Sequence, residues 1–177
     1  MEEALPYKYQ YPHPAVAADC LVFGYNGNSL KILLIRRKND PYKGYWAVPG
    51  GFSNMDETID ETAKRELREE TGLEVSDVEL YGVFSKPDRD PRERVIGITY
   101  LTIIRLRDAV GGDDAEKAQW FDIDNLPELA FDHAQSVELA KKHLKELNKL
   151  REPQFNADTE MFSPAEMLHL RLLIEEM

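Results

Sequence analysis

Residues 51–73 of this chain read GFSNMDETIDETAKRELREETGL. The middle of this stretch, residues 59–70, contains neither proline nor glycine, which predicts a helix. Thr58 can cap the start of the helix, and Gly72 stands where a left-handed C-terminal cap belongs. A Pro-Gly-Gly sequence at residues 49–51 predicts a turn just before it. The sequence therefore predicts a turn, a capped helix and a defined stop.

The predicted helix carries acidic side chains on the face that should meet the core. On a helical wheel of about 100° per residue, its apolar stripe consists of Ile59, Ala63 and Leu67. Glu66 and Glu70 fall within that stripe or at its border, and Glu69 lies beside them. Buried carboxylates need a cation, and the i, i+3, i+4 spacing lets these three converge on a hard ion such as Mg²⁺. The alternative is a solvated acidic helix with i,i+4 ion pairs.

The same stretch resembles the signature of the Nudix hydrolases. The pattern consists of Gly51, five residues, Glu57, seven residues, Arg65-Glu66-Leu67, one residue, Glu69-Glu70, one residue and Gly72-Leu73. The resemblance covers roughly residues 15–148. It implies an α/β protein with the Nudix-type α/β/α sandwich and a mixed β-sheet. It also implies a metal-dependent enzyme that hydrolyses the pyrophosphate bond of a small nucleoside diphosphate derivative, with Mg²⁺ or alternatively Mn²⁺.

The resemblance also implies roles for residues within and beside the signature. It assigns metal binding to the backbone carbonyl of Gly50 and to Glu66, Glu69 and Glu70. Glu69 is at the same time a candidate catalytic base. Arg65 is expected to pair with Glu57 and so to hold the helix against the preceding loop.

Composition and charge limit the partners and the compartment. At 177 residues the chain has the length of one domain, and its formal net charge of −11 argues against a nucleic-acid partner held on a broad basic surface. Cys20 is the single cysteine and lies in an apolar run, which favours core packing in a reducing cytoplasm. The acidic N-terminus lacks a signal-peptide core, and no apolar run approaches a membrane span. We expect a cytoplasmic protein with neither a nucleic-acid nor a membrane partner.

Apolar runs and turn residues predict the remaining elements. Strands are expected at residues 15–25, 30–37, 45–48, 78–86, 94–106 and 117–122, the first two joined by an Asn26-Gly27 hairpin turn. Helices are expected at residues 133–149, capped by Asp132, and from the capping box at Ser163 to about Glu176, after a linker at residues 151–162. This order predicts a mixed sheet between helices.

The expected organisation is an N-terminal arm at residues 1–14, a Nudix domain at 15–149, and a linker with a C-terminal helix at 150–177. The arm carries Tyr7, Tyr9 and Tyr11 on alternate positions. It can pack on its own domain, take part in a dimer or stack on substrate. Because many relatives pair through such segments, the resemblance implies a homodimer.

Two pairs of arginines are candidate substrate ligands. Arg36 and Arg37 end a strand, where the resemblance implies contact with a substrate phosphate; a surface ion pair is the alternative. Arg89 and Arg92 flank Asp90-Pro91, so they can clamp a phosphate or a ribose. Alternatively, this turn is held by an internal Arg–Asp pair.

Two further residues are candidates by resemblance. Glu116 lies in the acidic segment that begins at Asp113 and Asp114, where such families often keep a catalytic base; a solvated loop acid is the alternative. His133 resembles the last residue of the family's Phe-Asp-His segment and would bind substrate. Its alternative role, a polar residue beside a helix cap, is slightly favoured.

The loop Ser85-Lys86-Pro87-Asp88-Arg89-Asp90-Pro91-Arg92 resembles one typical of certain ADP-ribose pyrophosphatases. It implies hydrolysis of ADP-ribose to AMP and ribose 5-phosphate. Other nucleoside diphosphate sugars or nucleoside triphosphates are alternative substrates. Residues 161–168 resemble the start of the winged helix in ADP-ribose-sensing regulators of NAD metabolism. Because the signature keeps every acid and the chain stops at Met177, the enzyme is favoured over a regulator that lacks a complete winged helix.

Overall fold

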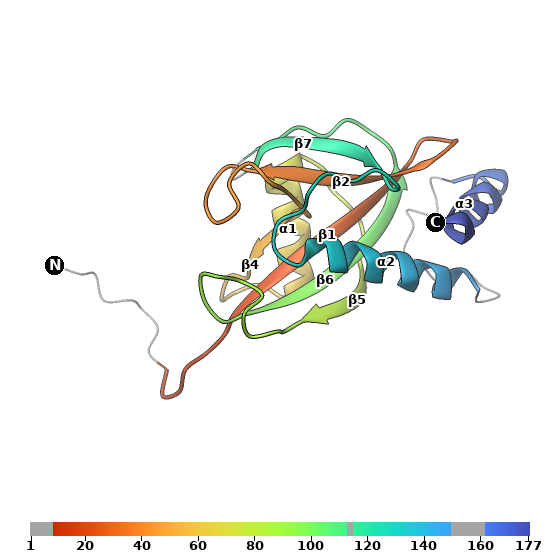
Figure 1. Ribbon diagram of the computed structural model, residues 1–177. Helices are drawn as coiled ribbons and strands as arrows, with labels where there is room; N and C mark the ends of the chain where they lie inside the picture. The colour runs from red at the N-terminus through yellow and green to blue at the C-terminus, as the bar shows by residue number, and fades with distance from the viewer. Residues whose placement is uncertain (1–8, 113–114, 150–161) are drawn as a thin grey trace.

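The computed structural model describes residues 9–112, 115–149 and 162–177. Figure 1 shows how its strands and helices are arranged. The strands are β1 (Ala15–Tyr25), β2 (Leu30–Arg37), β3 (Trp46–Ala47), β4 (Gly50–Phe52), β5 (Glu79–Phe84), β6 (Val95–Arg105) and β7 (Ala115–Asp122). The helices are α1 (Ile59–Thr71), α2 (His133–Asn148) and α3 (Pro164–Glu176). Within the described residues, no helix is both long and apolar enough to cross a membrane.

Strand β1 lies at the centre of a seven-stranded sheet. Five strands follow the order β3-β2-β1-β6-β5, while β4 pairs with β1 and β7 pairs with β2. Strand β1 runs parallel to β6 and antiparallel to β2 and β4. These last two strands share one edge of β1, because β2 pairs with residues 23–25 and β4 pairs with residues 17–19. Between them, the Cys20 N–H donates to the Pro49 carbonyl oxygen over 2.8 Å. The sheet therefore splits near the middle of β1, and Asp19 lies at the split.

Apolar side chains of β1 alternate between two hydrophobic cores, one on each face of the sheet. The core on one face includes Ala18, Cys20 and Val22 of β1 with Ala63 and Leu67 of α1. The core on the other face includes Leu21, Phe23 and Tyr25 of β1 with residues of α2 and α3. Figure 1 accordingly shows α1 and α2 on opposite sides of the strands. The predicted mixed sheet between helices is confirmed, and Cys20 packs in a core as expected.

The first two predicted strands are present with the predicted bounds, 15–25 and 30–37. Their hairpin turn is held by the Asn26 side chain, whose Oδ1 accepts a hydrogen bond from the Ser29 N–H over 2.8 Å. The other predicted strands differ from the structure by one or two residues at their ends. Hydrophobic pattern located these strands well because each has an apolar face to bury.

Strand β4 is a correction to the sequence analysis, which expected only a turn at residues 49–51. Gly50 and Gly51 instead pair with β1 as a short strand. A Cβ atom on Gly50 would lie 2.4 Å from the carbonyl oxygen of Ala18. Glycine, which in the sequence indicated a turn, therefore serves here to let the backbones of β4 and β1 approach closely.

The signature helix begins at the predicted residue and ends within one residue of the predicted end. Thr58 is the N-cap residue, and its N–H donates to the Glu61 carboxylate over 2.7 Å. Gly72 ends the helix in the left-handed region with φ of 70°. The capping box at Ser163 is likewise present at the start of α3. Local capping rules therefore fixed the bounds of both helices.

The expected position of Asp132 at the start of α2 is confirmed, but the side-chain capping bond that such a position usually provides is not formed. Asp132 occupies the N-cap position but makes no side-chain cap hydrogen bond. Its carboxylate instead accepts two hydrogen bonds from the Arg89 guanidinium, over 2.8 and 2.7 Å. A charged, two-pronged tertiary contact has replaced the local one because it is the stronger bond for a carboxylate.

The expected N-terminal arm falls partly outside the described residues, which begin at residue 9 and so leave out Tyr7. Tyr9 and Tyr11 are exposed. They lie in irregular backbone. The division of the chain into arm, domain and C-terminal segment stays a prediction.

The expected linker at residues 151–162 also lies outside the described residues, except for Phe162. Phe162 is buried, and its ring packs edge-on against Tyr25 with centroids 5.7 Å apart. It is therefore part of the core beneath α3 rather than of a linker.

Replacement of Leu67 tests the core that holds α1 on the sheet. Leu67→Ala is expected to lower the free energy of unfolding by about 2–5 kcal/mol, because it leaves a cavity under a fully buried side chain. Urea denaturation followed by circular dichroism measures the change. Leu172→Ala, on the exposed face of α3, is the control and should alter stability by no more than about 0.5 kcal/mol. Equal effects of the two substitutions would contradict this account of the core.

Candidate active site

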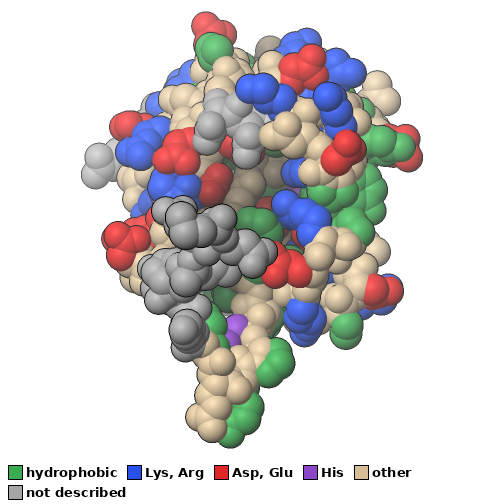
Figure 2. Space-filling view, turned by 90° about the vertical axis from the view of Figure 1, so that its left-hand side faces the viewer, with side chains coloured by type: hydrophobic (Ala, Val, Ile, Leu, Met, Phe, Trp, Pro, Cys, Tyr) green, Lys and Arg blue, Asp and Glu red, His purple; other side chains and the backbone are tan. Residues whose placement is uncertain are grey.

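A pocket of about 470 Å³ opens where the sheet splits. Its walls come from α1 and from strands β1 to β4 and β6, and from segments near residues 38–40, 89–92 and 131–133, the last at the start of α2. Figure 2 looks onto this end of the molecule, where acidic and basic side chains lie close together around a recess. The pocket therefore brings together segments that are far apart in the sequence and carry charges of both signs.

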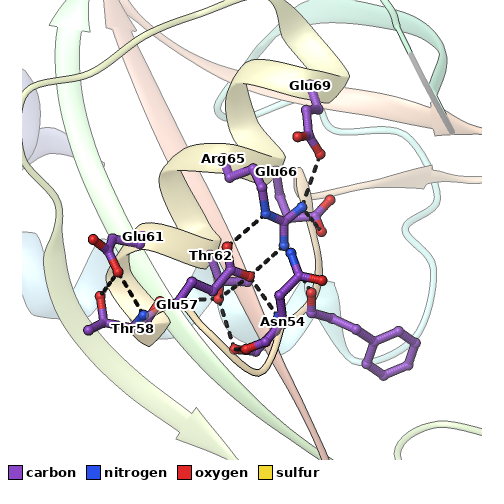
Figure 3. Close-up of polar contacts among 10 residues, drawn as sticks. Asn54, Glu57, Thr58, Glu61, Thr62, Arg65, Glu66 and Glu69 are labelled. Carbon is purple, nitrogen blue, oxygen red and sulfur yellow. Dashed lines mark hydrogen bonds and ion pairs between the residues drawn. The ribbon is translucent and has the colours of Figure 1, made fainter. Parts of the chain in front are cut away.

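Arg65 is the centre of the polar network on the α1 side of the pocket (Figure 3). Its Nε and Nη2 donate to the two oxygens of Glu57 over 2.9 and 2.7 Å. Its Nη1 donates to Glu66 over 2.7 Å and to Glu69 over 3.0 Å. Its Nη2 also donates to the Phe52 carbonyl oxygen over 3.0 Å. The expected Arg65–Glu57 pair is present, and the same guanidinium ties β4 to the helix.

This network fixes the charge state of Glu57. The hydrogen bonds from Arg65 lower the pKa of the Glu57 carboxyl to about 2, and bonds from the Asn54 N–H and the Thr62 hydroxyl act in the same direction. Glu57 is therefore a permanent anion at neutral pH. It positions the loop before α1 through Arg65 and Thr62, and it does not line the pocket described here.

Two buried carboxylates, Asp19 and Glu70, and the partly buried Glu66 lie on the floor of the pocket. Glu70 is 5% exposed; burial raises the pKa of its carboxyl to about 8, although the Gly50 N–H donates to it over 2.9 Å. Asp19 is 8% exposed, and burial raises the pKa of its carboxyl to about 7. Burial also raises the pKa of Glu66, against the opposing effect of Arg65. The charge of Glu66 also raises the pKa of Asp19 and of Glu70, and the charge of Asp19 raises the pKa of Glu70. Without a cation, the floor therefore holds protons more tightly than ordinary carboxylates do.

Asp19 was missed by the sequence analysis. It is the acidic residue within the otherwise apolar run of β1, Ala15–Tyr25. A carboxylate in the middle of a central strand is costly unless it has a function or a partner. This position was therefore a signal that could have been used.

The expected convergence of Glu66, Glu69 and Glu70 on one point is not present. Glu66 and Glu69 turn toward Arg65, while Glu70 turns toward the Gly50 N–H. Across the described ranges, no three His, Cys, Asp or Glu side chains are placed to hold a metal ion together. The donor set nevertheless fits a hard divalent cation: the side chains are carboxylates, they are buried or partly buried, and their mutual repulsion would be relieved by a cation.

The two glycines of β4 leave space for two carboxylates of the pocket, Glu66 and Asp19. A Cβ on Gly51 would lie 2.5 Å from the carboxyl carbon of Glu66, and one on Gly50 would lie 2.4 Å from Oδ1 of Asp19. A larger residue at either position would push a carboxylate out of the pocket. Gly50 lines the pocket as expected; its service as a carbonyl ligand stays a prediction.

The opposite wall of the pocket is built from arginines and aromatic rings. Arg92 lies over the rings of Phe52 and Phe131, at 4.9 and 5.7 Å from their centroids, and Arg37 lies over Phe131 at 4.9 Å. Such cation–π contacts hold a guanidinium in place against the wall. Phe131 adopts φ of 52°, an uncommon value for a bulky residue, so the chain is bent to bring this ring to the wall.

Arg89 and Arg92 line the pocket and are also paired with aspartates. Arg89 is held by Asp132. Arg92 donates to Asp90 over 3.0 and 2.7 Å. The internal Arg–Asp pair that was the alternative for this turn is therefore present between Arg92 and Asp90. Arg89 and Arg92 nevertheless both line the pocket. Each aspartate fixes the orientation of its guanidinium.

Arg36 and Glu116 lie elsewhere. They form an ion pair of 3.7 Å with each other, and both side chains are about half exposed. Arg36 also donates to the Gly44 carbonyl oxygen over 3.1 Å. Within the described part of the chain, neither side chain lines the pocket, whereas Arg37 does, because neighbouring residues of a strand point to opposite faces. Asp113 and Asp114, which led to the choice of Glu116, lie outside the described residues.

His133 is a buried anchor at the edge of the pocket. Its Nδ1 accepts a hydrogen bond from the Val48 N–H over 2.9 Å. Burial lowers the pKa of the imidazole to about 4, so His133 is neutral at physiological pH. It ties the start of α2 to the segment that leads into β4. It also lines the pocket, so contact with substrate stays a prediction.

A NUDIX domain family model matches residues 13–140. The chain belongs to the Nudix family. Every residue that lines the pocket lies within the matched range. The site built above is therefore contained in the Nudix domain.

This Nudix chain is 49% identical over 131 residues to the ADP-ribose pyrophosphatase of Methanocaldococcus jannaschii, which covers 73% of this chain and 75% of that protein. It is 32% identical over 158 residues to the ADPR responsive transcriptional repressor NtrR of Acinetobacter baylyi. That match covers 85% of this chain but 62% of the repressor. With the family match, the first relative identifies the chain as a Nudix hydrolase.

Solved structures agree with the fold. A MutT/nudix family protein from Enterococcus faecalis superimposes with a TM-score of 0.76 at 32% identity, over 86% of this chain and 69% of that one. The NUDIX domain of Shewanella oneidensis NrtR complexed with ADP ribose gives a TM-score of 0.72 at 27% identity, over 78% of this chain and 94% of that one. The predicted Nudix-type α/β/α sandwich is confirmed.

The environment of His133 predicts a pH dependence of stability. An unfolded histidine binds a proton near its ordinary pKa of 6.5, whereas the buried His133 resists protonation until about pH 4. Its contribution is fully present above pH 6.5 and is lost as the pH falls toward 4, by about 3 kcal/mol at most. The free energy of unfolding of His133→Asn should therefore fall less steeply across this window, as measured by urea denaturation. The control is His13→Asn on the exposed N-terminal segment; an unchanged slope in His133→Asn would contradict the prediction.

Proposed function

We propose that this Nudix hydrolase cleaves the pyrophosphate bond of ADP-ribose to give AMP and ribose 5-phosphate, with Mg²⁺ as its metal. The observation that carries the proposal is one pocket with two chemistries. Carboxylates of α1 form one wall, and the guanidinium groups of Arg37, Arg89 and Arg92 form the other. The first suits a divalent cation and the second suits phosphate oxygens.

Glu66, Glu70 and the Gly50 carbonyl would hold the cation, with Glu69 beside them; Mn²⁺ is an alternative. When bound, the cation neutralises phosphate charge and lowers the pKa of a coordinated water. Arg65 orients the glutamates, because its guanidinium contacts Glu66 and Glu69 at once. The hydrogen bond from the Gly50 N–H holds Glu70 against β4.

Glu69 and Glu116 are the two candidates for the catalytic base, and the position of Glu69 in the pocket favours Glu69. Glu69 lines the pocket, and its side chain is 35% exposed, so it can reach a water molecule in the pocket. Its bond to Arg65 leaves one carboxylate oxygen free to accept a proton. Glu116 would have to leave its ion pair with Arg36 and move toward the pocket to serve.

The aromatic and guanidinium wall suits the remainder of the substrate. Arg92, held between Phe52 and Phe131 by cation–π contacts, presents its edge to phosphate or ribose oxygens. The ring of Phe52, which is 37% exposed, offers a surface for stacking with an adenine base. The names of two relatives, an ADP-ribose pyrophosphatase and a NUDIX domain complexed with ADP ribose, support this choice of substrate over other nucleoside diphosphate sugars or nucleoside triphosphates.

A second candidate function is the sensing of ADP-ribose without hydrolysis. It is suggested by the similarity to the repressor NtrR, of which this chain covers 62%. Every acid of the Nudix signature is present here, which favours the enzyme. Specific, salt-resistant binding of DNA in a gel-shift experiment, together with no turnover, would favour the sensor.

Two further expectations stay predictions: the assembly of a homodimer and a cytoplasmic location. The N-terminal segment at residues 9–14 exposes tyrosine side chains that are available for a dimer contact. Light scattering coupled to gel filtration measures the mass of the assembly.

Glu70→Gln is expected to abolish turnover of ADP-ribose and to leave the fold intact. The amide oxygen can still accept the Gly50 N–H bond, but the neutral side chain is a poor ligand for Mg²⁺. Chromatographic measurement of AMP release with Mg²⁺ gives the activity, and circular dichroism reports the fold. Glu74→Gln, at an exposed position just after α1, is the control and should retain full activity. Near-normal turnover by Glu70→Gln would show that the site is assigned wrongly.

A substrate panel tests the specificity separately. ADP-ribose should be hydrolysed with a higher kcat/KM than other nucleoside diphosphate sugars or nucleoside triphosphates, each assayed with Mg²⁺ and then with Mn²⁺. Formation of AMP and ribose 5-phosphate in equal amounts locates the cleaved bond at the pyrophosphate. Efficient hydrolysis of another member of the panel, with no AMP from ADP-ribose, would overturn the choice of substrate.

A further inference from the structure

We propose that Asp19 of β1 is a further ligand of the divalent cation in this pocket, supplied by the sheet rather than by the signature helix. The inference rests on the proposed metal-dependent function. Asp19 is 8% exposed, and the part of it that remains accessible lines the pocket. It stands outside the signature stretch at residues 51–73.

The geometry places the Asp19 carboxylate against the same backbone as the glutamates. Asp19 pairs with Gly50 across the β1–β4 ladder. A Cβ on Gly50 would lie 2.4 Å from Oδ1 of Asp19, so this oxygen occupies the space that the glycine leaves open. Glu70 accepts the N–H of the same Gly50, and Glu66 lies against Gly51. Carboxylates from a strand and from a helix therefore meet at one two-residue segment.

Asp19 differs from these neighbours in lacking a partner. Glu66 bonds to Arg65, and Glu70 bonds to the Gly50 N–H. The Asp19 carboxylate makes no hydrogen bond or ion pair with any residue in the described ranges. Arg89 contributes a favourable charge, but its guanidinium is held by two hydrogen bonds to Asp132. A buried carboxylate without a partner is costly, and a cation in the pocket would supply the missing partner.

The consequence is that the cation would join the two parts of the site. With the glutamates alone, it would be held by α1 and the β4 turn. With Asp19, it is also attached to β1 at the point where the sheet splits between β2 and β4. Binding of the cation should therefore stabilise the sheet as well as the helix.

Asp19→Asn tests this inference on the full chain, without substrate. Calorimetric titration with Mn²⁺ should show an affinity at least about tenfold weaker than that of the wild type, because an anionic ligand is lost. The rise in melting temperature on adding Mg²⁺ should shrink accordingly. In EDTA the variant should be at least as stable as the wild type, because a buried unpaired charge is removed. Asp122→Asn, on the exposed side of β7, is the matched control and should bind Mn²⁺ like the wild type.

The outcomes separate this inference from the proposed function. If the wild type binds neither Mn²⁺ nor Mg²⁺, the metal-dependent function itself fails. If the wild type and Asp19→Asn bind Mn²⁺ equally, the inference fails and the function stands. A third outcome is that Asp19→Asn is less stable than the wild type in EDTA, while Mg²⁺ raises the melting temperature of both proteins equally. Asp19 would then stabilise the fold through its charge interaction with Arg89, and the inference would again be overturned.

A second variant gives a direct readout of ligation and does not depend on how Asp19→Asn folds. Asp19→Cys places a soft thiolate at the same position, so it should favour Cd²⁺ over Mg²⁺. Bonding of the thiolate to Cd²⁺ should produce an ultraviolet absorbance band that is absent from the wild type, whose Cys20 is fully buried. Absence of this band in folded Asp19→Cys would contradict a direct bond from position 19 to the metal.

Discussion

The structure depends on how the negative charge buried beside β4 is balanced. Carboxylates from α1 and β1 meet at two glycines, and such a cluster is unfavourable without cations. Arg65 supplies the protein's own compensation, because its planar fork contacts Glu57, Glu66 and Glu69 simultaneously. A lysine could not do this with a single ammonium group. This one guanidinium also ties α1 to β4 through the Phe52 carbonyl, and the carboxylates that it leaves without a partner suit the floor of the pocket to a divalent cation.

The opposite wall follows a related rule. Asp132 and Asp90 hold Arg89 and Arg92 in fixed orientations, so a substrate that binds there does not have to order long flexible side chains. The contact between Asp132 and Arg89 also explains why α2 begins without a side-chain cap. Helix α2 thus lacks a stabilising side-chain cap because Asp132 instead orients Arg89 in the pocket. Such departures from local rules are typical of functional sites.

Much of the site could be predicted from the sequence because its central part is local. Arg65, Glu66 and Glu69 lie on neighbouring turns of one helix, and Glu57 belongs to the loop before it. Of the site residues predicted outside this stretch, some line the pocket and others do not. Arg37 lines the pocket, while its neighbour Arg36 points away to Glu116. Asp19 was overlooked because a single acid in an apolar strand has no motif, and its meaning appears only when β4 brings Gly50 against it.

By itself, the sequence determined the signature helix with both of its ends, most strands, the two-sided core and the family. These follow from hydrophobic period, capping residues and spacing, which act over a few residues. The tertiary structure decided what depends on contacts between distant segments. It made a strand of Gly50 and Gly51, directed Asp132 to Arg89, made His133 a neutral anchor for Val48, and placed Asp19 beside the glutamates. Each of these outcomes depends on a partner more than twenty residues away, a distance at which local pattern carries no information.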